Sequence, residues 1–366
     1  MAVDVASRPV QAILEQVLEG SRLGDEDAAA LLRSRDLIAV GRAADEMRSR
    51  KSDPDEVTFI VDRNINYTNV CVTDCDFCAF YRRPGDTREG YVLPAPVIHK
   101  KIEETLALGG TAVLMQGGHH PDLGIEWYED LFSGIKQRYK IHLHALSPPE
   151  IQHISRRSKL TTAETLSRLR DSGLDSLPGG GGEVLVDRVR KIIAPKKTKT
   201  AEWLGVMRQA HRLGMSTTAT MMYGHVETLE ERVEHMRRIR ELQDEMHGFR
   251  AFISWTFQPD NTRLGKQVKE TPTSFDYLLT QAVSRLYLDN VDHIQSSWVT
   301  QGLKIGQVAL HFGADDLGSI MIEENVVSAA GTTYCADVDD FCRLIRSAGK
   351  RPVQRDTLYR RVRAYD

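Results

Sequence analysis

Short apolar segments alternate with amphipathic segments along most of this 366-residue chain, and the alternation limits the folds that are open to it. The short segments have the composition of buried β-strands, whereas the segments between them keep apolar residues at helical spacing. The expected strands are residues 57–61, 112–115, 141–146, 174–177, 217–222, 251–257, 291–296 and 317–320. The expected helices between them are residues 96–108, 127–139, 163–171, 202–213, 229–246, 275–288 and 301–312.

Strands and helices in this order predict an α/β fold, and specifically a (β/α)8 barrel of the TIM type. A doubly wound open sheet shows the same alternation, but it usually stops at about five to seven strands. Outside the alternating part, residues 9–50 predict two or three short helices and residues 336–348 one more, while residues 352–359 look like a surface strap. We expect three parts, namely an N-terminal helical extension, the barrel, and a C-terminal helix with its tail, over residues 1–50, 51–330 and 331–366.

Composition and charge exclude several classes of function. Hydrophobic residues make up 41% of the chain, and the net charge of −3 argues against nucleic-acid or membrane partners drawn to a basic surface. No apolar run approaches the roughly 20 residues that span a bilayer, and the first residues lack the basic and apolar stretches of a signal peptide. Five cysteines, three of them clustered, fit metal binding in a reducing compartment better than disulfides. We therefore expect a cytoplasmic protein.

The clustered cysteines, Cys71, Cys75 and Cys78, follow the first expected strand. Their Cys-x-x-x-Cys-x-x-Cys spacing supplies three thiolates, where a closed zinc site or an electron-carrying cluster normally takes four ligands. Three thiolates on a four-iron cluster leave one iron open to a small molecule, and Phe77 can shield one face of the cluster from water. The position favours this interpretation, because barrel enzymes carry catalytic groups on such strand–helix loops. A zinc site completed by a distant histidine or cysteine is the alternative.

Glycines follow two other expected strands. Gly117 and Gly118 come after the second strand, where bare backbone lets a ligand lie close, although a plain turn would use them too. Four consecutive glycines after the fourth strand precede Glu183, which we expect to accept hydrogen bonds from hydroxyls of a nucleoside or substrate. A flexible hinge is the alternative there. His119 and His120 are adjacent, and neighbours in a chain rarely point at one metal, so we expect no ligand role for them.

Aromatic and polar residues end the later strands. Met222 and Tyr223 can pack on a flat ring, and His225 follows them, although methionine is also common in ordinary cores. The sixth strand again ends in aromatic residues and one amide. His142 and His144 share one face of the third strand, because side chains alternate with a period of two, and we expect them to be structural.

Together these features resemble the radical S-adenosylmethionine (SAM) superfamily, in which three cysteines at this spacing follow strand one, a Gly-Gly turn follows strand two, and a barrel lies behind them. Longer segments are similar to one branch of it, which serves the futalosine route to menaquinone and the synthesis of deazaflavin. These segments are residues 64–71, 79–82, 115–121, 144–149, 177–183, 218–228, 252–259 and 323–325. His119 departs from the superfamily, where many members carry Glu, so we expect Gln116 or backbone carbonyls to recognise the methionine amino group.

The resemblance implies a [4Fe-4S] cluster held by the three cysteines, with SAM chelated to the open iron through its amino and carboxylate groups. One electron from the reduced cluster cleaves SAM to methionine and a 5′-deoxyadenosyl radical, which takes a hydrogen atom from the substrate. A deep barrel suits such a radical because it keeps water and side reactions out. The residues expected to bind these cofactors, apart from the cysteines, are Phe77, Gln116, Gly117, Gly118, Ser147, Glu183, Met222 and Gln258.

Within the branch, residues 75–83 and 255–259 look most like the cyclic dehypoxanthinyl futalosine synthases. The resemblance then implies dehypoxanthinyl futalosine as the small-molecule substrate, removal of its ribose C4′ hydrogen, and addition of the carbon radical to the benzoate ring. A base takes the final proton, and the candidates are Glu183, His225 and Tyr223, which we expect at the mouth of the barrel. Reduced flavodoxin or ferredoxin is the expected electron donor.

Other functions stay open at this point. Aminofutalosine synthases and deazaflavin-forming synthases share the barrel and the cluster, and only pocket residues distinguish them. An iron–sulfur electron carrier is a different class, but it would need a fourth nearby cysteine. A zinc-stabilised binding protein is the remaining alternative. Arg82 and Arg83 beside the cysteines are candidate donors to the substrate benzoate, or else solvated surface charges.

Overall fold

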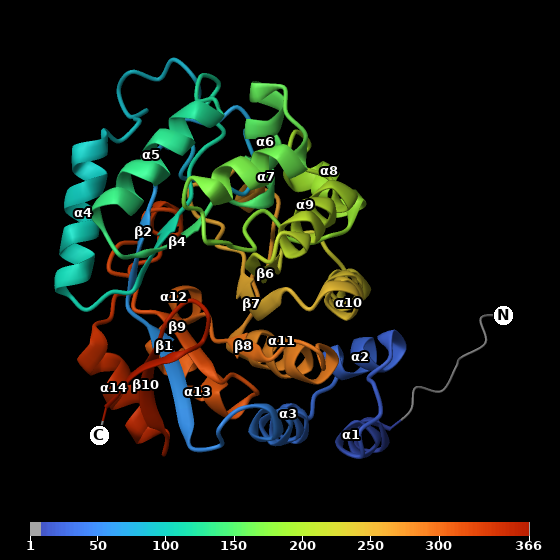
Figure 1. Ribbon diagram of the computed structural model, residues 1–366. Helices are drawn as coiled ribbons and strands as arrows, with labels where there is room; N and C mark the ends of the chain where they lie inside the picture. The colour runs from blue at the N-terminus through green and yellow to red at the C-terminus, as the bar shows by residue number, and fades with distance from the viewer. Residues whose placement is uncertain (1–8, 366) are drawn as a thin grey trace.

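The computed structural model describes residues 9–365, and its centre is a ring of parallel strands surrounded by helices (Figure 1). The strands follow one another round the ring in chain order: β1 (Glu56–Ile60), β2 (Asp62–Ile65), β3 (Ala112–Met115), β4 (His142–Ala145), β5 (Ser176–Leu177), β6 (Ser216–Tyr223), β7 (Phe249–Thr256), β8 (His293–Gln295) and β9 (Asp316–Ser319). Residues 1–8, on which the expectation of no signal peptide rests, lie outside the described part.

The ring closes through its first segment. β1 and β2 are interrupted only at Val61, and β1 pairs with β9 while β2 pairs with β3. The pairing therefore returns to its starting point, with β1 and β2 together acting as one strand of eight. The structure confirms the (β/α)8 barrel over the open sheet, and each of the eight expected strands overlaps an observed one.

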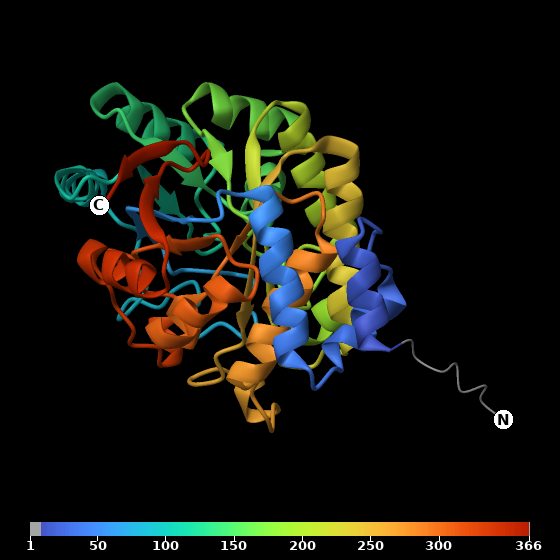
Figure 2. The ribbon, with the colours of Figure 1, turned by 90° about the horizontal axis from the view of Figure 1, so that it is seen from below.

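Helices cover the outer face of the ring, as expected from the amphipathic segments (Figures 1 and 2). They are α4 (Ala95–Ala107), α5 (Ile125–Arg138), α6 (Pro148–Ser158), α7 (Thr162–Asp171), α8 (Asp187–Ile193), α9 (Thr200–Arg212), α10 (Leu229–Met246), α11 (Ser274–Tyr287), α12 (Trp298–Gln301) and α13 (Leu303–Val308). Single 3-10 turns occur at Leu264–Lys266, Ala309–His311 and Ser328–Ala330. Helices α6 and α8 were absent from the sequence prediction.

Alternation along each strand separates the core from the interior of the barrel. On β6, Ala219, Met221 and Tyr223 are fully buried in the apolar layer between strands and helices, whereas Thr218 and Thr220 line the interior. Successive strand side chains point to opposite faces, so one strand serves both surfaces. The interior can therefore be polar without weakening the layer that holds helices to strands.

Three helices precede the barrel: α1 (Val10–Leu18), α2 (Asp25–Leu32) and α3 (Leu37–Lys51). They lie together beside α11 (Figure 1), and α3 packs along α11. Gly41 of α3 lets the helix approach Phe312, which follows the 3-10 turn Ala309–His311, since a Cβ built on Gly41 would lie 2.4 Å from the Phe312 ring. The sequence expectation of two or three short helices is thus confirmed.

The C-terminal tail corrects the sequence prediction of a surface strap. After α14 (Val338–Ser347) the chain forms β10 (Arg351–Arg355), which pairs in parallel with β1, and then β11 (Arg361–Ala364), which pairs antiparallel with β10. Val353 and Arg355 are 1% and 4% exposed. The tail is buried because β10 extends the barrel sheet and the following turn covers the end of the ring from which the parallel strands start. Sequence alone gave no sign of this, since the pairing joins residues about 300 positions apart in the chain.

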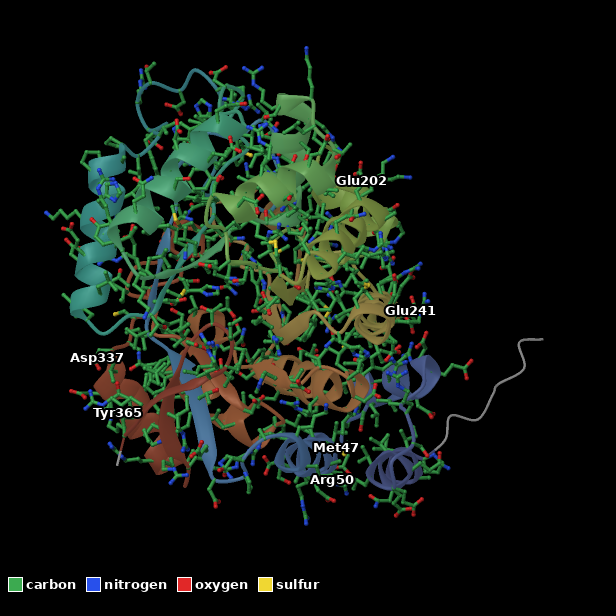
Figure 3. The ribbon with its side chains drawn as sticks, in the orientation of Figure 1. Met47, Arg50, Glu202, Glu241, Asp337 and Tyr365 are labelled. Atoms are coloured by element: carbon green, nitrogen blue, oxygen red, sulfur yellow. The ribbon has the colours of Figure 1, made fainter. Side chains whose placement is uncertain are left out.

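The outer surface is charged and polar. Arg50, Glu241 and Asp337 project from α3, α10 and the start of α14 (Figure 3), and each is exposed. Within residues 9–365, no helix combines the length and the apolar character needed to cross a bilayer.

Candidate active site

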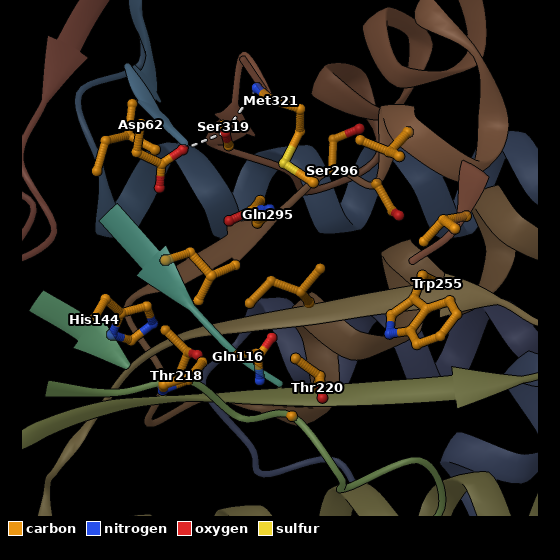
Figure 4. Close-up of a pocket in the computed structure, with 18 of the residues that line it drawn as sticks. Asp62, Gln116, His144, Thr218, Thr220, Trp255, Gln295, Ser296, Ser319 and Met321 are labelled. Carbon is orange, nitrogen blue, oxygen red and sulfur yellow. Dashed lines mark hydrogen bonds between the residues drawn. The ribbon is translucent and has the colours of Figure 1, made fainter. Parts of the chain in front are cut away.

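A cavity of about 300 Å³ occupies the inside of the barrel. Figure 4 shows its polar side chains converging from several strands, among them Asp62 of β2, His144 of β4 and Gln295 of β8. Its upper part is lined by the loops that follow β3 and β5, including Gln116 and Glu183. Its floor is formed by the C-terminal tail, through Arg355, Thr357 and Tyr359. The volume is at the lower end of the range typical for small-molecule sites.

The cysteine loop lies at the C-terminal ends of the strands, after β2. A backbone hydrogen bond from Cys71 N to Arg82 O (2.8 Å) closes the loop on itself, and one from Asp76 N to Ile193 O (2.8 Å) fixes it to α8. Cys75 is 7% exposed, and burial raises the pKa of its thiol, with the ammonium of Lys197 opposing that change. The loop is therefore preformed, and it holds its central thiol out of water.

Glu183 connects this loop to the cavity. Its carboxylate lies 2.7 Å from the ammonium of Lys197 and 3.4 Å from the guanidinium of Arg190, and all three side chains are largely buried. Burial acts to lower the pKa of Lys197, but the charge of Glu183 and the neighbouring Cys75 outweigh it, so the pKa is raised. Lys197 also lies 5.1 Å from the centre of the Phe77 ring. A buried cation thus stands between the carboxylate and the thiol.

Close packing against protein accounts for several of the glycines. A Cβ on Gly117 would lie 2.6 Å from the Tyr67 ring, and one on Gly118 would lie 2.2 Å from Val70 O, so both glycines pack against the cysteine loop, and their contact with a cofactor stays a prediction. In the four-glycine run, Gly179 is pressed against the backbone of β6. Only Gly180 and Gly181 line the cavity, and there the close approach of a ligand stays a prediction.

Of the expected cofactor residues Ser147 and Gln116, the first is hydrogen-bonded within the protein and the second faces the cavity. Ser147 caps α6, because its backbone N–H and its hydroxyl both donate to Glu150 at 2.7 and 2.5 Å. Glu150 also accepts from Gly117 N (2.9 Å) and from the Tyr67 hydroxyl (2.7 Å), so it joins three segments around the cysteine loop. The Gln116 side-chain amide makes no hydrogen bond to another described residue and faces the cavity, which leaves it free for a ligand.

Two of the three candidate bases do not line the cavity. Tyr223 points into the layer between β6 and the helices, with the Arg232 guanidinium 4.4 Å from its ring centre. The expectation that it stands at the mouth is wrong, because it alternates with the inward-facing Thr220. His225 is fully buried and lies 3.1 Å from Glu227; burial lowers the pKa of its imidazole. Glu183 alone of the three faces the cavity.

The other expected cofactor residues gather near the cysteine loop. Met222 is buried in a small apolar cluster with Cys75 and Phe257, and Phe77 packs against that cluster. Gln258 is turned back on its own chain, where its amide donates to Thr256 O at 3.0 Å. Their contact with a cofactor stays a prediction.

The charged and ring groups beside the cysteines are mostly taken up by protein contacts. Arg82 pairs with Glu89 at 2.5 Å, and Arg83 is 71% exposed, so neither lines the cavity. His119 accepts or donates at 2.7 Å with the Thr73 hydroxyl inside the cysteine loop, and its burial lowers the pKa of the imidazole. The cavity-lining arginine is instead Arg355 on the floor.

Comparison with known proteins assigns the family. Residues 65–239 match the radical SAM superfamily, and residues 246–365 match the CofH/MqnC C-terminal region. The chain is 47% identical over 360 residues to a cyclic dehypoxanthine futalosine synthase of Streptomyces coelicolor, covering 98% of this chain and 90% of that protein. The chain belongs to the radical SAM superfamily.

Relatives with other activities are nearly as similar. A 5-amino-6-(D-ribitylamino)uracil–L-tyrosine 4-hydroxyphenyl transferase of Methanosarcina acetivorans is 44% identical, over 96% of this chain and 93% of its own. An aminodeoxyfutalosine synthase of Thermus thermophilus is 40% identical, over 97% and 96%. Among solved structures, the [FeFe]-hydrogenase maturase HydG superposes with a TM-score of 0.73 over 96% of this chain and 76% of its own, at 14% identity, which supports the fold alone.

As a radical SAM enzyme, the chain uses a [4Fe-4S] cluster and SAM. The cysteine loop fits the cluster for two reasons. The thiols of Cys71, Cys75 and Cys78 lie close enough together to affect one another's pKa, and the buried ammonium of Lys197 is near enough to favour the thiolate form. The other two thiols are remote from it, since Cys335 is exposed and Cys342 is buried in the main core. Within residues 9–365, no three candidate ligands converge on the position of a single ion. A four-iron cluster instead binds each thiolate to a separate iron, so the three sulfur atoms need not converge on one point.

Sequence reasoning missed two cavity residues, Asp62 and Arg355. Asp62 is 9% exposed, and the only hydrogen bond between its carboxylate and a described residue comes from the Ser319 hydroxyl. Burial raises its pKa to about 6, and the Ser319 hydrogen bond opposes the rise. A charged residue inside an apolar strand was a signal for Asp62. Arg355 gave no signal, because its place depends on the pairing of β10 with β1.

Proposed function

We propose that this enzyme cyclises dehypoxanthinyl futalosine, by removal of the ribose C4′ hydrogen and addition of the resulting radical to the benzoate ring. The observation that carries the proposal is one cavity inside the barrel, which Glu183 lines at its upper part and the C-terminal tail closes below. Glu183 is paired with Lys197, which acts electrostatically on Cys75, so the cavity and the cysteine loop are neighbours. A cavity closed at one end suits a reaction in which one substrate folds onto itself. The 47% identity to a protein of that name over nearly the whole chain supports the same activity.

The protein contributes positioning and exclusion of water. Cys71, Cys75 and Cys78 would hold the cluster, which with SAM supplies the 5′-deoxyadenosyl radical. Gln116 offers an unpaired amide at the upper end of the cavity, and Glu183 offers its carboxylate beside it. Groups held in place before the reaction lower the entropic part of the barrier. Apolar wall residues keep water away from the carbon radical.

The middle of the cavity combines a flat apolar surface with small polar groups. Trp255 of β7 presents its indole, while Thr218 and Thr220 of β6 present hydroxyl groups (Figure 4). A benzoate ring and a ribose need this mixture, since the ring buries apolar area and the hydroxyls of the sugar need partners. Arg355 at the floor is the one arginine of the lining, and its guanidinium is already paired with the carboxylate of Asp316.

We further propose that reduced flavodoxin or ferredoxin donates the electron and that the enzyme works in the cytoplasm. Of the three residues expected as bases, Glu183 alone faces the cavity, and we propose that its carboxylate accepts hydrogen bonds from hydroxyls of the bound molecules there.

An anaerobic assay tests the proposal. The purified chain is reconstituted with iron and sulfide, reduced with dithionite, and given SAM with dehypoxanthinyl futalosine. Mass spectrometry should detect 5′-deoxyadenosine and a substrate product two hydrogens lighter. Deoxyadenosine without that product would move the substrate to an aminofutalosine- or deazaflavin-type reaction, which the 40–44% relatives make the second candidate.

A further inference from the structure

Two histidines of β4 share one hydroxyl at the start of β5. The His144 Nδ1 lies 2.6 Å from Ser176 Oγ, and the His142 Nε2 lies 2.7 Å from the same oxygen. Ser176 is 1% exposed. Side chains of a strand alternate between its two faces, so both imidazoles lie on the inner face of β4, where they are direct neighbours. Sequence reasoning gave these histidines only a structural role.

The two histidines that share the Ser176 hydroxyl line different cavities. His144 lines the cavity inside the barrel, opposite Asp62 and near Thr218 (Figure 4). His142 lines a separate surface pocket of about 660 Å³, whose other residues come from the loops below the strands and from the C-terminal tail. The tail that seals the floor therefore leaves one hydrogen-bonded connection between the cavity and the outside.

The shared hydroxyl makes the connection directional. A serine hydroxyl donates one proton and accepts others, so it donates to one imidazole while the second imidazole donates to it. When His144 carries its proton on Nδ1, Ser176 donates to His142 Nε2, and the outer proton sits on His142 Nδ1. A proton that arrives at His144 Nε2 can then displace one proton at each step.

Cyclisation creates a need for such a connection. Once the carbon radical has added to the benzoate ring, the intermediate holds one electron and one proton more than the aromatic product. The electron passes to a one-electron acceptor of the iron–sulfur class, and the proton must leave a cavity that excludes water. We infer that His144, Ser176 and His142 form the route by which this proton leaves the barrel. The inference rests on the proposed cyclisation.

Each transfer balances. The ring C–H bond breaks and His144 Nε2 gains the proton, while His144 Nδ1 gives its own proton to Ser176 Oγ. Ser176 passes its original proton to His142 Nε2, and His142 Nδ1 releases one proton to the pocket. One proton enters and one leaves, and a change of tautomer resets the path between turnovers. His144 is the group that touches substrate, whereas Ser176 and His142 position and pass the proton.

The charged groups differ between the two ends of the path. Burial lowers the pKa of His144 to about 3, with His142 and Arg355 adding to the effect, so His144 does not retain a proton at neutral pH. Burial also lowers the pKa of His142, but Asp175 and Asp356 oppose that change, while Lys136 and Arg360 support it. Each of these carboxylates is paired with one of these cations, so the outer end of the path holds two ion pairs beside the pocket.

The test uses the reconstituted full chain with SAM and dehypoxanthinyl futalosine, and compares the variants Ser176→Ala and His142→Ala with wild type. We expect iron content and deoxyadenosine formation to persist, and the rate of cyclised product to fall by about 100-fold, at the lower end of the range for lost proton transfer. Imidazole should restore His142→Ala, since its pocket opens to solvent, and the wild-type product rate should slow in D2O.

A matched control comes from a similar pair elsewhere. His211 Nε2 lies 2.7 Å from Thr217 Oγ1, both are buried, and neither lines the cavity or the pocket of His142. Thr217→Val removes that hydroxyl and should leave the product rate, the D2O effect and the imidazole response unchanged. A structural loss common to buried histidine–hydroxyl pairs would instead slow both sets of variants.

Three results would overturn the inference in distinguishable ways. Relay variants that make product at the wild-type rate would remove the path and leave the cyclisation standing. A loss that imidazole does not restore, matched by Thr217→Val, would make the contact structural. A wild-type enzyme that forms deoxyadenosine but no cyclised product would overturn the proposed function, and with it this proton's route. A ¹⁵N NMR spectrum in which Ser176→Ala shifts the ring nitrogens of both His142 and His144 would support the shared hydroxyl without any substrate.

Discussion

The two ends of the barrel both bury ionic side chains, but they balance charge differently. At the mouth, the single carboxylate of Glu183 serves two cations, Lys197 and Arg190, and the cysteine thiols lie beside them. At the floor, Arg355 has its own partner, Asp316, through two contacts of 2.5 and 2.8 Å.

The difference separates a site that awaits a ligand from one that is complete. With neutral thiols, the mouth carries one buried positive charge in excess, which becomes balanced when anionic thiolates bind a cluster. The charged groups of the floor are already paired, as the ion pair of Arg285 with Asp315 also shows. We therefore expect substitutions at the mouth to change activity and substitutions at the floor to change stability.

The largest effect should follow removal of a thiol at the mouth. Cys75→Ala should abolish cluster assembly and all cleavage of SAM, because two thiolates cannot hold the cluster, while the barrel stays folded. Iron analysis, deoxyadenosine formation and circular dichroism measure the three properties. Cys335→Ala is the control, since that thiol is exposed and remote, and it should keep full iron content. Normal turnover by Cys75→Ala would refute the assignment of the loop.

Glu183→Gln removes the carboxylate that two buried cations share. We expect the cluster to assemble, because the cysteines are untouched, but cyclised product per deoxyadenosine to fall by about 100-fold, as when a positioned acid–base or binding group is lost. The measurement is the ratio of the two products by mass spectrometry. Glu245→Gln breaks an exposed pair with Arg208 and should leave the ratio unchanged. A wild-type ratio in Glu183→Gln would show that Glu183 only supports its loop.

At the floor, Arg355→Met should lower the free energy of unfolding by about 3–5 kcal/mol, because it leaves the buried carboxylate of Asp316 without its cationic partner. Urea denaturation measures the change. Arg360→Met breaks an exposed pair with Asp356 and should cost at most about 1 kcal/mol. Equal changes in the free energy of unfolding for the two substitutions would contradict the view that the buried ion pair of the floor stabilises the fold.

Much of the fold was predictable because its signals are local. The eight strands and most helices follow from periodicity, and the cysteine spacing places the loop after the first strand. The period of two could also have corrected Tyr223, since Thr218, Thr220 and Met222 share a parity and Tyr223 has the other. The partners of Glu183 and the burial of Arg355 could not be predicted in this way. Both depend on segments that meet only after the barrel has closed.

The smallest effect is expected at Asp62, whose carboxyl group lines the cavity between the mouth and the floor. Its pKa is raised to about 6, against about 3.8 for the unperturbed group, and burial is the main cause. Between these two values the native state holds a proton that the unfolded state has lost, so stability is present at low pH and is lost as the pH rises through about 6. The change amounts to about 3 kcal/mol, from about two pKa units at 1.36 kcal/mol each.

Asp62→Asn cannot ionise and should remove that slope while its amide oxygen still accepts from Ser319. Urea unfolding of both proteins at pH 4, 5, 6 and 7 measures the free energy of unfolding. The difference between variant and wild type should shift in favour of the variant by up to about 3 kcal/mol as the pH rises from 4, and it should become constant well above pH 6. Parallel curves would mean that water or a fixed cation already solvates the carboxylate. The charge of Asp62 would then be compensated within the protein, like that of Arg355 at the floor and unlike the excess positive charge at the mouth.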